Sequence, residues 1–302
     1  MKRLFAFGCS FTNYAWPTYA DFLSYEFEEY QNWGFPGLGN RAIAERVAEC
    51  HAKNNFNKDD TILVQWTSHT RNDFHTFKEI NYNEDTFIHG YFRPTNKIGW
   101  KTQGNIFGSG NLELNYDSKW INNFWDEKSY FMYSMNEILL TQGLLDSTSC
   151  KWRMITISDI AKLGSDMPPT AGETKSNLLN EENVWEEKSE FNCYRETIFK
   201  GKYKNNWLKP IGLFAWGRTE DLYMFRGPND PEPYQDFHPS NKHHYDYLND
   251  VVRPSLGLTK YNNTKQQSMY EKITRFKEQT NDFISFQKKI IHDTPHKGYI
   301  GF

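Results

Sequence analysis

The sequence predicts an α/β protein built as a three-layer α/β/α sandwich around a parallel central sheet. Three short apolar runs, at 3–7, 61–66 and 152–157, have the length and composition of buried strands. Segments with apolar residues at helical spacing separate the first two runs, and another, at 130–145, precedes the third. Because parallel strands need a long crossover, usually a helix, this alternation indicates a parallel sheet covered on both faces.

The first sixty residues predict a strand, a helix, a loop and a second helix. Residues 3–7 end at Gly8, as a buried strand does before a turn. Pro17 suits the first turn of a helix. That helix carries apolar residues at helical spacing, namely Tyr19, Phe22, Leu23 and Phe27. A glycine-rich loop spans 32–39, and Asn40 can then cap a second helix. The apolar face of the second helix carries Ile43, Ala44, Val47 and Ala48.

Two irregular stretches rich in aromatic residues, at about 74–128 and 160–230, show no sustained periodicity and are interpreted as insertions. After the second stretch, Ser240 is positioned to cap a further helix. The tail is charged and rich in glutamine, with apolar residues at intervals that favour helix. We therefore expect one α/β domain over 1–258 and a C-terminal helical extension over 259–302 packed on it.

The composition argues against several classes of protein. The chain has 302 residues, a net charge of −3 and a pI near 6.3, so we expect no nucleic-acid partner, which would need a basic face. No apolar run reaches the length of a membrane span, so no membrane partner is expected. Aromatic residues make up 17% of the chain. Packing in the core is the favoured interpretation of this excess, and a platform for sugar rings or other planar ligands is the alternative.

The cysteines indicate the compartment. Cys9, Cys50, Cys150 and Cys193 are widely separated and form no CxxC pair, which is typical of a reducing compartment rather than of a disulfide framework. The apolar start of the chain has some likeness to a signal peptide, but it is short and lacks a clear cleavage site, so we interpret it as the first strand. We expect a cytoplasmic protein, and the sequence does not indicate its oligomeric state.

The first motif that carries chemistry is Gly8-Cys9-Ser10-Phe11-Thr12, directly after the first predicted strand. A serine at the carboxyl end of a parallel strand lies at the edge where α/β sheets bind ligands. A glycine beside it allows a sharp turn and the close approach of a substrate. Taken alone, such a motif is most often only a turn, so its meaning depends on the motifs that accompany it.

The second motif, Asn32-x-Gly34-x-x-Gly37-x-Gly39-Asn40, is a glycine-rich loop before a helix. Its backbone N–H groups can bind an anion, either a phosphate or the oxyanion of an acyl-transfer intermediate. The spacing has a likeness to a dinucleotide-binding fingerprint, but no acidic residue follows about twenty positions later at a clear strand end. Nucleotide binding is therefore the lesser alternative.

The third motif is Asp236-Phe237-His238-Pro239, near the end of the predicted domain. A histidine that acts as a base needs a carboxylate to fix its tautomer and stabilise its charged form. Two residues apart on a loop, Asp236 and His238 can face one site. The helix predicted from Ser240 places this loop at the edge of the α/β domain.

Together, the three motifs resemble the blocks of the SGNH/GDSL hydrolase family, over scattered segments of residues 4–256. The resemblance implies the flavodoxin-like SGNH hydrolase fold. It also implies a catalytic triad of Ser10, Asp236 and His238, and an oxyanion hole formed by the N–H groups of Ser10 and Gly37. Asp236 lies two residues before the histidine, where the family more commonly has three, and variants with the shorter gap occur in the family.

The family's third block, which supplies a further oxyanion donor, has two candidate positions. Counting from the strand 61–66, the family's asparagine falls on Ser68. By text, Arg71-Asn72-Asp73 resembles the family's Asn-Asp pair, which makes Asn72 the alternative. Both side chains can donate a hydrogen bond. Nearby, His69 and Arg71 are candidate substrate-binding residues, and a surface ion pair is an equally good interpretation of Arg71.

The resemblance implies a serine esterase that hydrolyses a carboxylic ester through an acyl-enzyme, with no metal or organic cofactor. The expected partner is a small-molecule or carbohydrate ester, with an O-acetyl or other small acyl group. Three alternatives stay open: an acyltransferase with the same triad, a non-catalytic glycan-binding or structural module, and a nucleotide-binding protein using residues 34–40. A zinc site around His238 lacks a clear ligand set.

Overall fold

The computed structural model describes residues 1–77, 99–105, 118–157, 188–213, 222–226, 232–258 and 264–293. Within these ranges, five strands form a central sheet with the order β2-β1-β3-β6-β7. Their bounds are β1 (Arg3–Phe7), β2 (Glu29–Asn32), β3 (Asp60–Trp66), β6 (Lys151–Thr156) and β7 (Trp207–Gly212). All neighbouring pairs in it are parallel. The expected α/β class with a parallel sheet is therefore confirmed, and the strand order is compatible with a flavodoxin-like fold.

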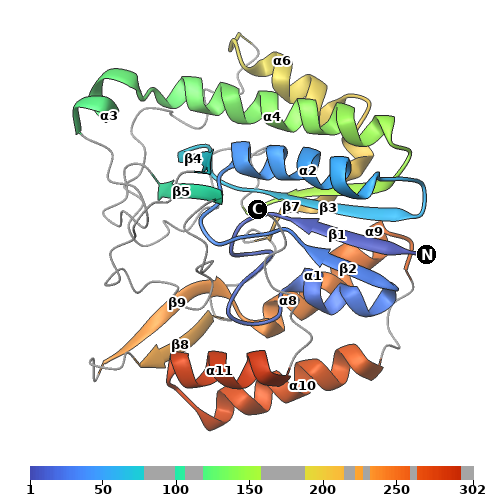
Figure 1. Ribbon diagram of the computed structural model, residues 1–302, viewed down its shortest axis with the longest axis vertical. Helices are drawn as coiled ribbons and strands as arrows, with labels where there is room; N and C mark the ends of the chain where they lie inside the picture. Colours follow the sequence, from blue (N-terminus) through green and yellow to red (C-terminus); the bar gives the residue numbers. More distant parts are fainter. Residues whose placement is uncertain are drawn as a thin grey trace.

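Helices cover both faces of this sheet (Figure 1). On one face lie α2 (Asn40–Asn54) and α4 (Glu127–Ser147), and on the other lie α1 (Tyr19–Leu23) and α8 (Asn241–Tyr247). The alternation of β1 explains the two layers, because successive side chains of a strand point to opposite faces. Phe5 and Phe7 belong to one core cluster with α2 and α4, whereas Leu4 and Ala6 belong to the other cluster with α1 and α8.

Two antiparallel hairpins lie outside the central sheet. They are β4 (Arg71–Thr76) with β5 (Gly99–Asn105), and β8 (Leu222–Arg226) with β9 (Pro233–Pro239). The remaining helices are mostly short. They are η1 (Ser24–Glu26), α3 (Ser118–Phe124), α6 (Asn192–Tyr194), η4 (Arg195–Lys200), η5 (Lys204–Asn206), η7 (Leu248–Val252), α9 (Arg253–Ser255), α10 (Thr264–Gln279) and α11 (Phe283–Asp293).

The C-terminal helices α10 and α11 pack beneath the β8–β9 hairpin (Figure 1). The ring of Phe225 on β8 lies 5.1 Å from that of Phe283 and 5.5 Å from that of Phe286. In addition, the backbone N–H of Arg226 donates to the carbonyl of Asn281 at 2.7 Å. The C-terminal helices therefore support a hairpin that the central sheet does not hold.

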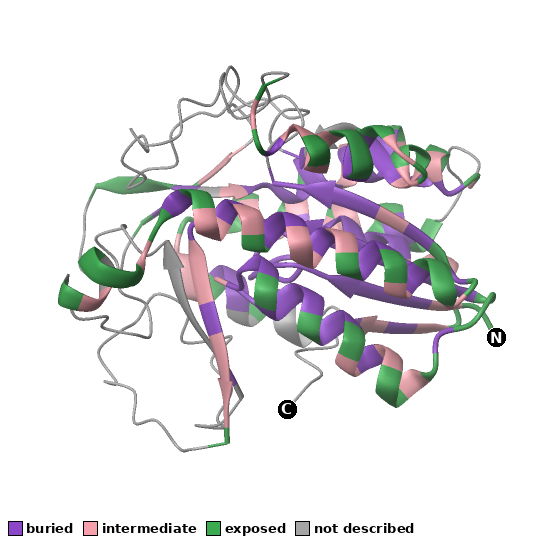
Figure 2. Cartoon of the chain, turned by 90° about the horizontal axis from the view of Figure 1, so that it is seen from above, coloured by how far each residue is buried: buried purple, intermediate pink, exposed green. Residues whose placement is uncertain are grey.

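Aromatic residues supply the largest side chains of the core. All but one of the largest fully buried side chains are aromatic, the exception being Arg46. Figure 2 shows the buried strands at the centre and helices whose outer stripes are exposed. The aromatic excess of the sequence is thus used mainly for packing in the described ranges, which is the favoured interpretation above. Within the same ranges, no helix is long and apolar enough to cross a membrane.

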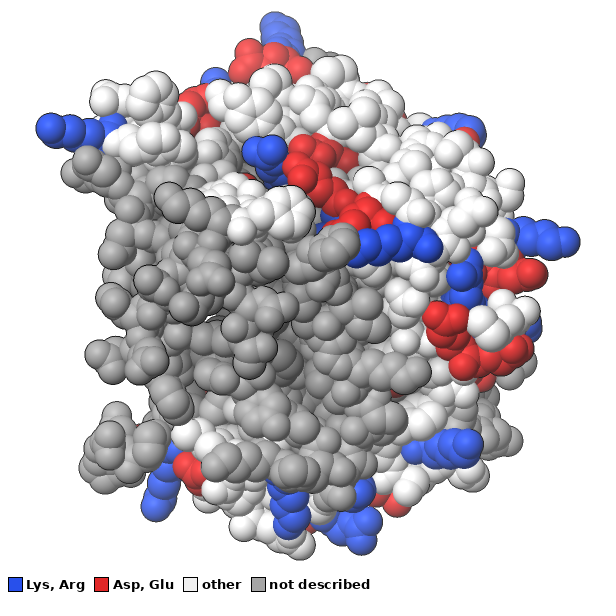
Figure 3. Space-filling view, viewed as in Figure 1, with Lys and Arg blue, Asp and Glu red and all other residues white. Residues whose placement is uncertain are grey.

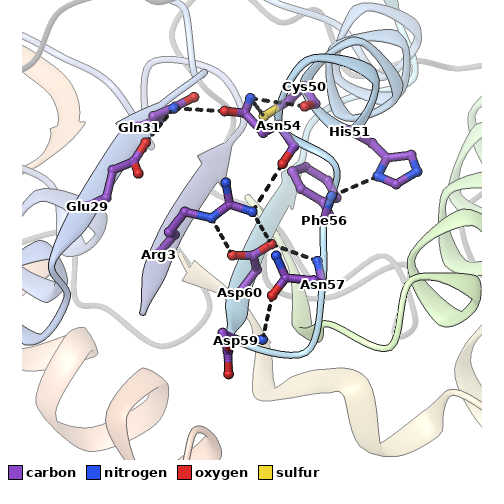
Figure 4. Close-up of polar contacts among 10 residues, drawn as sticks. All are labelled: Arg3, Glu29, Gln31, Cys50, His51, Asn54, Phe56, Asn57, Asp59 and Asp60. Atoms are coloured by element: carbon purple, nitrogen blue, oxygen red, sulfur yellow. Dashed lines mark hydrogen bonds and ion pairs between the residues drawn. The ribbon is translucent and has the colours of Figure 1, made fainter. Parts of the chain in front are cut away.

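A partly buried ion pair joins two strands at the amino-terminal end of the sheet (Figure 4). Arg3 on β1 donates from Nε and Nη2 to the two carboxylate oxygens of Asp60 on β3, both at 2.7 Å. Arg3 also donates to the carbonyl of Asn54 at the end of α2, and the N–H of Asn57 donates to Asp60. These bonds join β1, β3 and the turn between α2 and β3. They lie at the amino-terminal end of β1, whereas the motif at residues 8–12 follows its carboxyl end.

The surface carries charges of both signs. On the face shown in Figure 3, Lys and Arg side chains lie among Asp and Glu side chains. The described helices also carry exposed ion pairs one helical turn apart, such as Arg41–Glu45 at 2.9 Å and Lys242–Asp246 at 2.8 Å. Pairs of this kind on exposed helix faces contribute only a few tenths of a kcal/mol each, about 0.3–0.5.

Several sequence predictions need correction. The stretch 160–230 contains the fifth strand of the central sheet, β7, rather than an insertion alone. Its Pro210 lacks a backbone N–H and is tolerated because β7 is an edge strand. The polar strand β2 was not predicted, and the helix expected to reach Phe27 ends at Leu23, followed by a short 3-10 helix. Residue Asn40 does not cap α2; Gly39 holds the cap position, and the Asn40 side chain bonds elsewhere.

Candidate active site

The turn that carries Ser10 begins where β1 ends. The carbonyl of Cys9 accepts the N–H groups of Thr12 at 3.0 Å and Asn13 at 3.1 Å, which closes a tight turn around Ser10. Strand β1 lies between β2 and β3 in the sheet, and β2 and β3 follow it on opposite sides. Ser10 is therefore located at the carboxyl edge where the strand order reverses, the usual ligand-binding position in open α/β sheets.

Gly8 allows this turn to approach the neighbouring strand closely. Its φ is 156°, and a Cβ at this position would lie 2.2 Å from Oγ1 of Thr12 and 3.0 Å from Cβ of Gln65. Any side chain at residue 8 would therefore displace Thr12 or β3, and Ser10 with them. The glycine in the first motif therefore has a steric role in the turn, and the approach of a substrate that the sequence also suggested stays a prediction.

Asp236 and His238 are placed by a strand, not by the loop that the sequence suggested. Both lie on β9, which pairs only with β8 among the described strands. Residues two apart on a strand point to the same face, so the spacing Asp-x-His directs both side chains to one site. The predicted cap is confirmed, since Ser240 accepts the N–H of His243 at the start of α8.

The structure brings Ser10, His238 and Asp236 together in a hydrogen-bonded chain. The Nε2 atom of His238 lies 2.9 Å from the Oγ of Ser10, across 228 positions of sequence. The other ring nitrogen, Nδ1, lies 2.7 Å from Oδ1 of Asp236, which also accepts the backbone N–H of His238 at 2.8 Å. Ser10 is 5% exposed, and 21% of the His238 side chain is exposed. This is the arrangement of nucleophile, base and orienting carboxylate.

The carboxylate of Asp236 is ionised at neutral pH although it is buried. Burial by itself raises the pKa of Asp236, but the neighbouring imidazole and hydrogen bonds from His238 and Tyr14 outweigh it, so the net pKa is lowered. Tyr14 donates from Oη to Oδ2 at 2.8 Å. A negative Asp236 favours the tautomer with its proton on Nδ1, which leaves Nε2 to accept the proton of Ser10.

A network of buried hydrogen bonds holds the turn that carries Ser10. Oγ1 of Thr12 donates to Oε1 of Gln65 on β3 at 2.6 Å. The carbonyl of Thr12 accepts from Nδ2 of Asn32 at 2.9 Å and from Oγ1 of Thr18 at 2.7 Å. All four residues are buried. The turn two residues after Ser10 is therefore tied to β2, to β3 and to the start of α1.

The glycine-rich loop lies beside the nucleophile turn. The N–H of Phe35 donates to the carbonyl of Gly8 at 3.0 Å, and Gly37 has a left-handed φ of 86° that favours glycine. The N–H of Gly39 donates to both carboxylate oxygens of Asp73 at 2.9 and 3.0 Å, and that of Leu38 to the carbonyl of Phe35. The amides of Phe35, Leu38 and Gly39 thus already have protein acceptors, which leaves fewer donors in this loop for a bound phosphate.

Of the two candidates of the third block, Ser68 bonds within its own turn. Oγ of Ser68 lies 2.8 Å from Oγ1 of Thr70 and accepts the N–H of Thr70, so it stabilises its own turn. Asn72 lies on β4. Nε2 of His69 lies 3.2 Å from Oε1 of the buried Glu127, and Arg71 donates to the carbonyl of Leu38. Among the described residues, Arg71 makes no ion pair and His69 does not contact the triad.

Three residues shape the site through contacts that the sequence did not predict. Asn40 clamps the segment after β3, donating to the carbonyl of Thr67 at 3.0 Å and accepting its N–H at 2.8 Å. Asp73 caps α2, and Tyr14 contacts the triad directly. The position of Asn40 at the start of an apolar helix was a sequence signal for a polar contact there. Nothing in the local sequence marks Tyr14, because its partner Asp236 is 222 positions away.

The described ranges contain no group of three or more His, Cys, Asp or Glu side chains that could hold a metal ion. The zinc alternative around His238 therefore gains no ligand set there. Comparisons with known proteins add no assignment: no protein-family model matches the chain, and no curated protein matches it.

Proposed function

We propose that this protein is a serine esterase of the SGNH hydrolase type that works through an acyl-enzyme on Ser10. One observation carries the proposal: Nε2 of His238 lies 2.9 Å from Oγ of Ser10, while Nδ1 lies 2.7 Å from Asp236. Hydrogen bonds on both ring nitrogens are what a general base needs to accept a proton from the nucleophile. The location of Ser10 at the carboxyl edge of β1 supports the same function.

The reaction has two halves. Ser10 Oγ attacks the ester carbonyl as its proton moves to Nε2 of His238, and the tetrahedral intermediate expels the alcohol, which takes that proton. Water then attacks the acyl group, giving its proton to His238; the carboxylic acid leaves, and Ser10 regains its proton. Each half returns the imidazole to neutrality, and Asp236 stabilises the imidazolium that forms in between.

The oxyanion hole is part of the same proposal. Its donors are the N–H groups of Ser10 and Gly37, with a side chain of Ser68 or Asn72 as the third. The bond from the N–H of Phe35 to the carbonyl of Gly8 supports the pairing of the first two, because it holds the glycine loop beside the nucleophile turn. Removal of one such donor typically costs about 2.7–4 kcal/mol of transition-state stabilisation.

The proposed substrate is an ester of a small acyl group, with an acetylated carbohydrate as the natural class to test first. Ser10 is only 5% exposed, and the ring of Phe11 lies 5.3 Å from that of His238; we infer from this limited access to the nucleophile that a small acyl group is accepted best. Hydrolysis of 4-nitrophenyl acetate is therefore expected to exceed that of long-chain 4-nitrophenyl esters.

Labelling and hydrolysis test the proposal together. A fluorophosphonate should add one adduct to the wild type and none to Ser10→Ala, as measured by intact mass. Hydrolysis of 4-nitrophenyl acetate should fall by at least about a thousandfold in Ser10→Ala and in His238→Ala. A matched control is Ser24→Ala, whose hydroxyl donates within its own turn to the carbonyl of Asp21. An unlabelled wild type that hydrolyses no ester would instead support a non-catalytic module.

Acyl transfer is the second candidate, and the low exposure of Ser10 favours it, because a site that admits little water allows another hydroxyl to compete. Product analysis separates the two. With glycerol or an oligosaccharide added, a transferase forms the new ester in preference to free acetate, whereas a hydrolase releases acetate in the same amount with or without the acceptor.

A further inference from the structure

We propose that Tyr14 is a positioning residue of the active site, which sets the orientation of Asp236 and His238 relative to Ser10. The inference rests on the proposed esterase function and deepens it. Tyr14 lies four residues after Ser10, on the segment that forms the nucleophile turn, and it contacts Asp236 and His238 on β9 separately. No other residue of the described ranges touches both members of the Asp236–His238 pair through its side chain in the contacts given above.

The first contact fixes the carboxylate. Oδ1 of Asp236 accepts both the backbone N–H and Nδ1 of His238, and Oδ2 accepts the hydroxyl of Tyr14 at 2.8 Å. With partners on both oxygens, the carboxylate cannot rotate about its Cβ–Cγ bond without breaking a hydrogen bond. Loss of the Tyr14 hydroxyl would release that rotation and leave a buried acceptor without its donor, which is costly near a charge.

The second contact fixes the imidazole. The ring of Tyr14 stacks on that of His238 with centroids 3.7 Å apart and an interplanar angle of 19°. Phe11, on the same segment, lies 5.3 Å from the same imidazole. Both rings thus contact His238 from the segment that carries Ser10. These contacts keep the imidazole close to Ser10, although the two residues are 228 positions apart in the sequence. The π face of Tyr14 also favours the imidazolium formed during the reaction.

Tyr14 acts as a fixed donor rather than as a proton-transfer group. The residue is 3% exposed. Burial and then the adjacent Asp236 raise the pKa of Tyr14 well above its ordinary value of 10.0, so the hydroxyl keeps its proton at every pH where an esterase is assayed. Its oxygen contacts Asp236 and not Ser10, so its influence on the reaction passes through the carboxylate.

Tyr14→Phe is the central test, because it removes the hydroxyl and keeps the stacking ring. We expect kcat/KM for 4-nitrophenyl acetate to fall about tenfold, mostly in kcat, as for loss of one hydrogen bond to a charged group. The acidic limb of the pH profile should move to higher pH, because a donor that lowers the proton affinity of Asp236 is gone. The other titratable neighbours of the pair are Tyr234 on β9 and His244 on α8, and both are unchanged in this variant.

The chain offers a matched control in Tyr30→Phe. Its hydroxyl also donates to a buried carboxylate, Oδ1 of Asp21, at 2.8 Å, and Tyr30 is 6% exposed. The two variants should lose similar amounts of thermal stability, whereas only Tyr14→Phe should lose activity and shift the pH profile. Equal losses of activity in both would overturn the proposal, because they would mark a general effect of a broken buried hydrogen bond.

A double-mutant cycle isolates the route through Asp236. In the Asp236→Asn background, Tyr14→Phe should change kcat/KM less than twofold, because the carboxylate on which Tyr14 acts is gone. A full tenfold loss in that background would overturn the proposal. If Tyr14→Phe does not fold, 3-fluorotyrosine at position 14 replaces it: a more acidic hydroxyl should move the acidic limb to lower pH, and an unmoved limb would count against Tyr14.

Failure of this inference and failure of the esterase proposal give different results. A wild type that takes no fluorophosphonate and hydrolyses no ester removes the proposed function, and the role of Tyr14 with it. A wild type that is labelled at Ser10 and active, with Tyr14→Phe active within twofold and its pH profile unchanged, overturns the role of Tyr14 and leaves the esterase standing.

Discussion

The carboxylate of Asp73 accepts the backbone N–H of Gly39 through both oxygens, at 2.9 and 3.0 Å, across 34 positions of sequence. It also lies 3.4 Å from the N–H of Ala42, in the first turn of α2. A negative charge at the amino end of a helix satisfies N–H groups that have no partner within the helix and interacts well with the helix dipole. Asp73 lies on β4, so this cap ties the glycine-rich loop to β4.

Asp73→Ala should therefore weaken both the fold and the site. We expect unfolding free energy to fall by about 1–2 kcal/mol, the usual range for a lost helix cap. We also expect kcat/KM to fall, because the loop that holds Gly37 loses its anchor. Urea denaturation and the 4-nitrophenyl acetate assay measure the two effects. Arg41→Ala, at an exposed pair on the same helix, is the control and should alter neither by much. Reduced stability with unchanged kcat/KM would place Gly37 outside the oxyanion hole.

Gly8→Ala should disable the site. A Cβ at residue 8 would come within 2.2 Å of Oγ1 of Thr12, so the turn that holds Ser10 must move. A displacement of about 1 Å at a nucleophile can cost about a hundredfold in rate, which the ester assay would detect. Gly143→Ala is the control: residue 143 is exposed within α4, nothing lies within 4 Å of its added Cβ, and alanine should stabilise the helix by about 0.5–1 kcal/mol. An active Gly8→Ala would show that the turn tolerates a side chain.

Much of the central fold could be predicted from the sequence because its strands are apolar and its helices periodic. The runs at 3–7, 61–66 and 152–157 became β1, β3 and β6 within one residue at each end. The edge strands could not be found this way. An edge strand needs only one buried face and tolerates polar residues and proline, so β2 and β7 have no continuous apolar run. The edge strands are identified only by pairing with β1 and β6.

The candidate site divides in the same manner. Ser10, Asp236 and His238 could be proposed from short motifs, because each lies next to an element boundary that the sequence marks. The residues that hold the triad and the glycine-rich loop in place could not be predicted. Tyr14 and Asp73 have partners that are distant in sequence, and no periodicity reports such contacts. The cap predicted at Asn40 was wrong because its side chain bonds Thr67, while the distant Asp73 takes the capping role.

Arg3→Met should separate stability from activity. Asp60 is fully buried at its side chain, and Arg3 supplies two charge-assisted hydrogen bonds to it. Breaking a buried pair from one side leaves an uncompensated charge, which costs about 3 kcal/mol or more. The pair is at the amino end of β1 and Ser10 follows its carboxyl end, so kcat/KM at 20 °C should stay within twofold. Lys200→Met, at an exposed pair on η4, is the control and should leave the urea midpoint nearly unchanged. An equal shift of the urea midpoint in both variants would contradict the prediction that the buried carboxylate of Asp60 makes the loss of Arg3 costly.

His244→Phe should make the protein more resistant to acid. The ring of His244 is fully buried on α8, and neither ring nitrogen has a hydrogen-bond partner among the described residues. Burial and then the neighbouring His243 lower the pKa of His244 well below 6.5, so the folded protein keeps it neutral while the unfolded chain takes up a proton. Stability is then fully present above the unfolded pKa, near 6.5, and is lost as pH falls below it, by about 1.4 kcal/mol per pH unit.

Phenylalanine removes this titration without removing a hydrogen bond, because the imidazole makes none with the described residues. The difference in unfolding free energy between His244→Phe and wild type should therefore be constant above pH 7 and should grow steadily from pH 6.5 to pH 5. Urea denaturation at half-unit intervals measures it. Parallel stability curves for the two proteins over this range would mean that His244 becomes protonated within the folded state, which its burial beside His243 argues against.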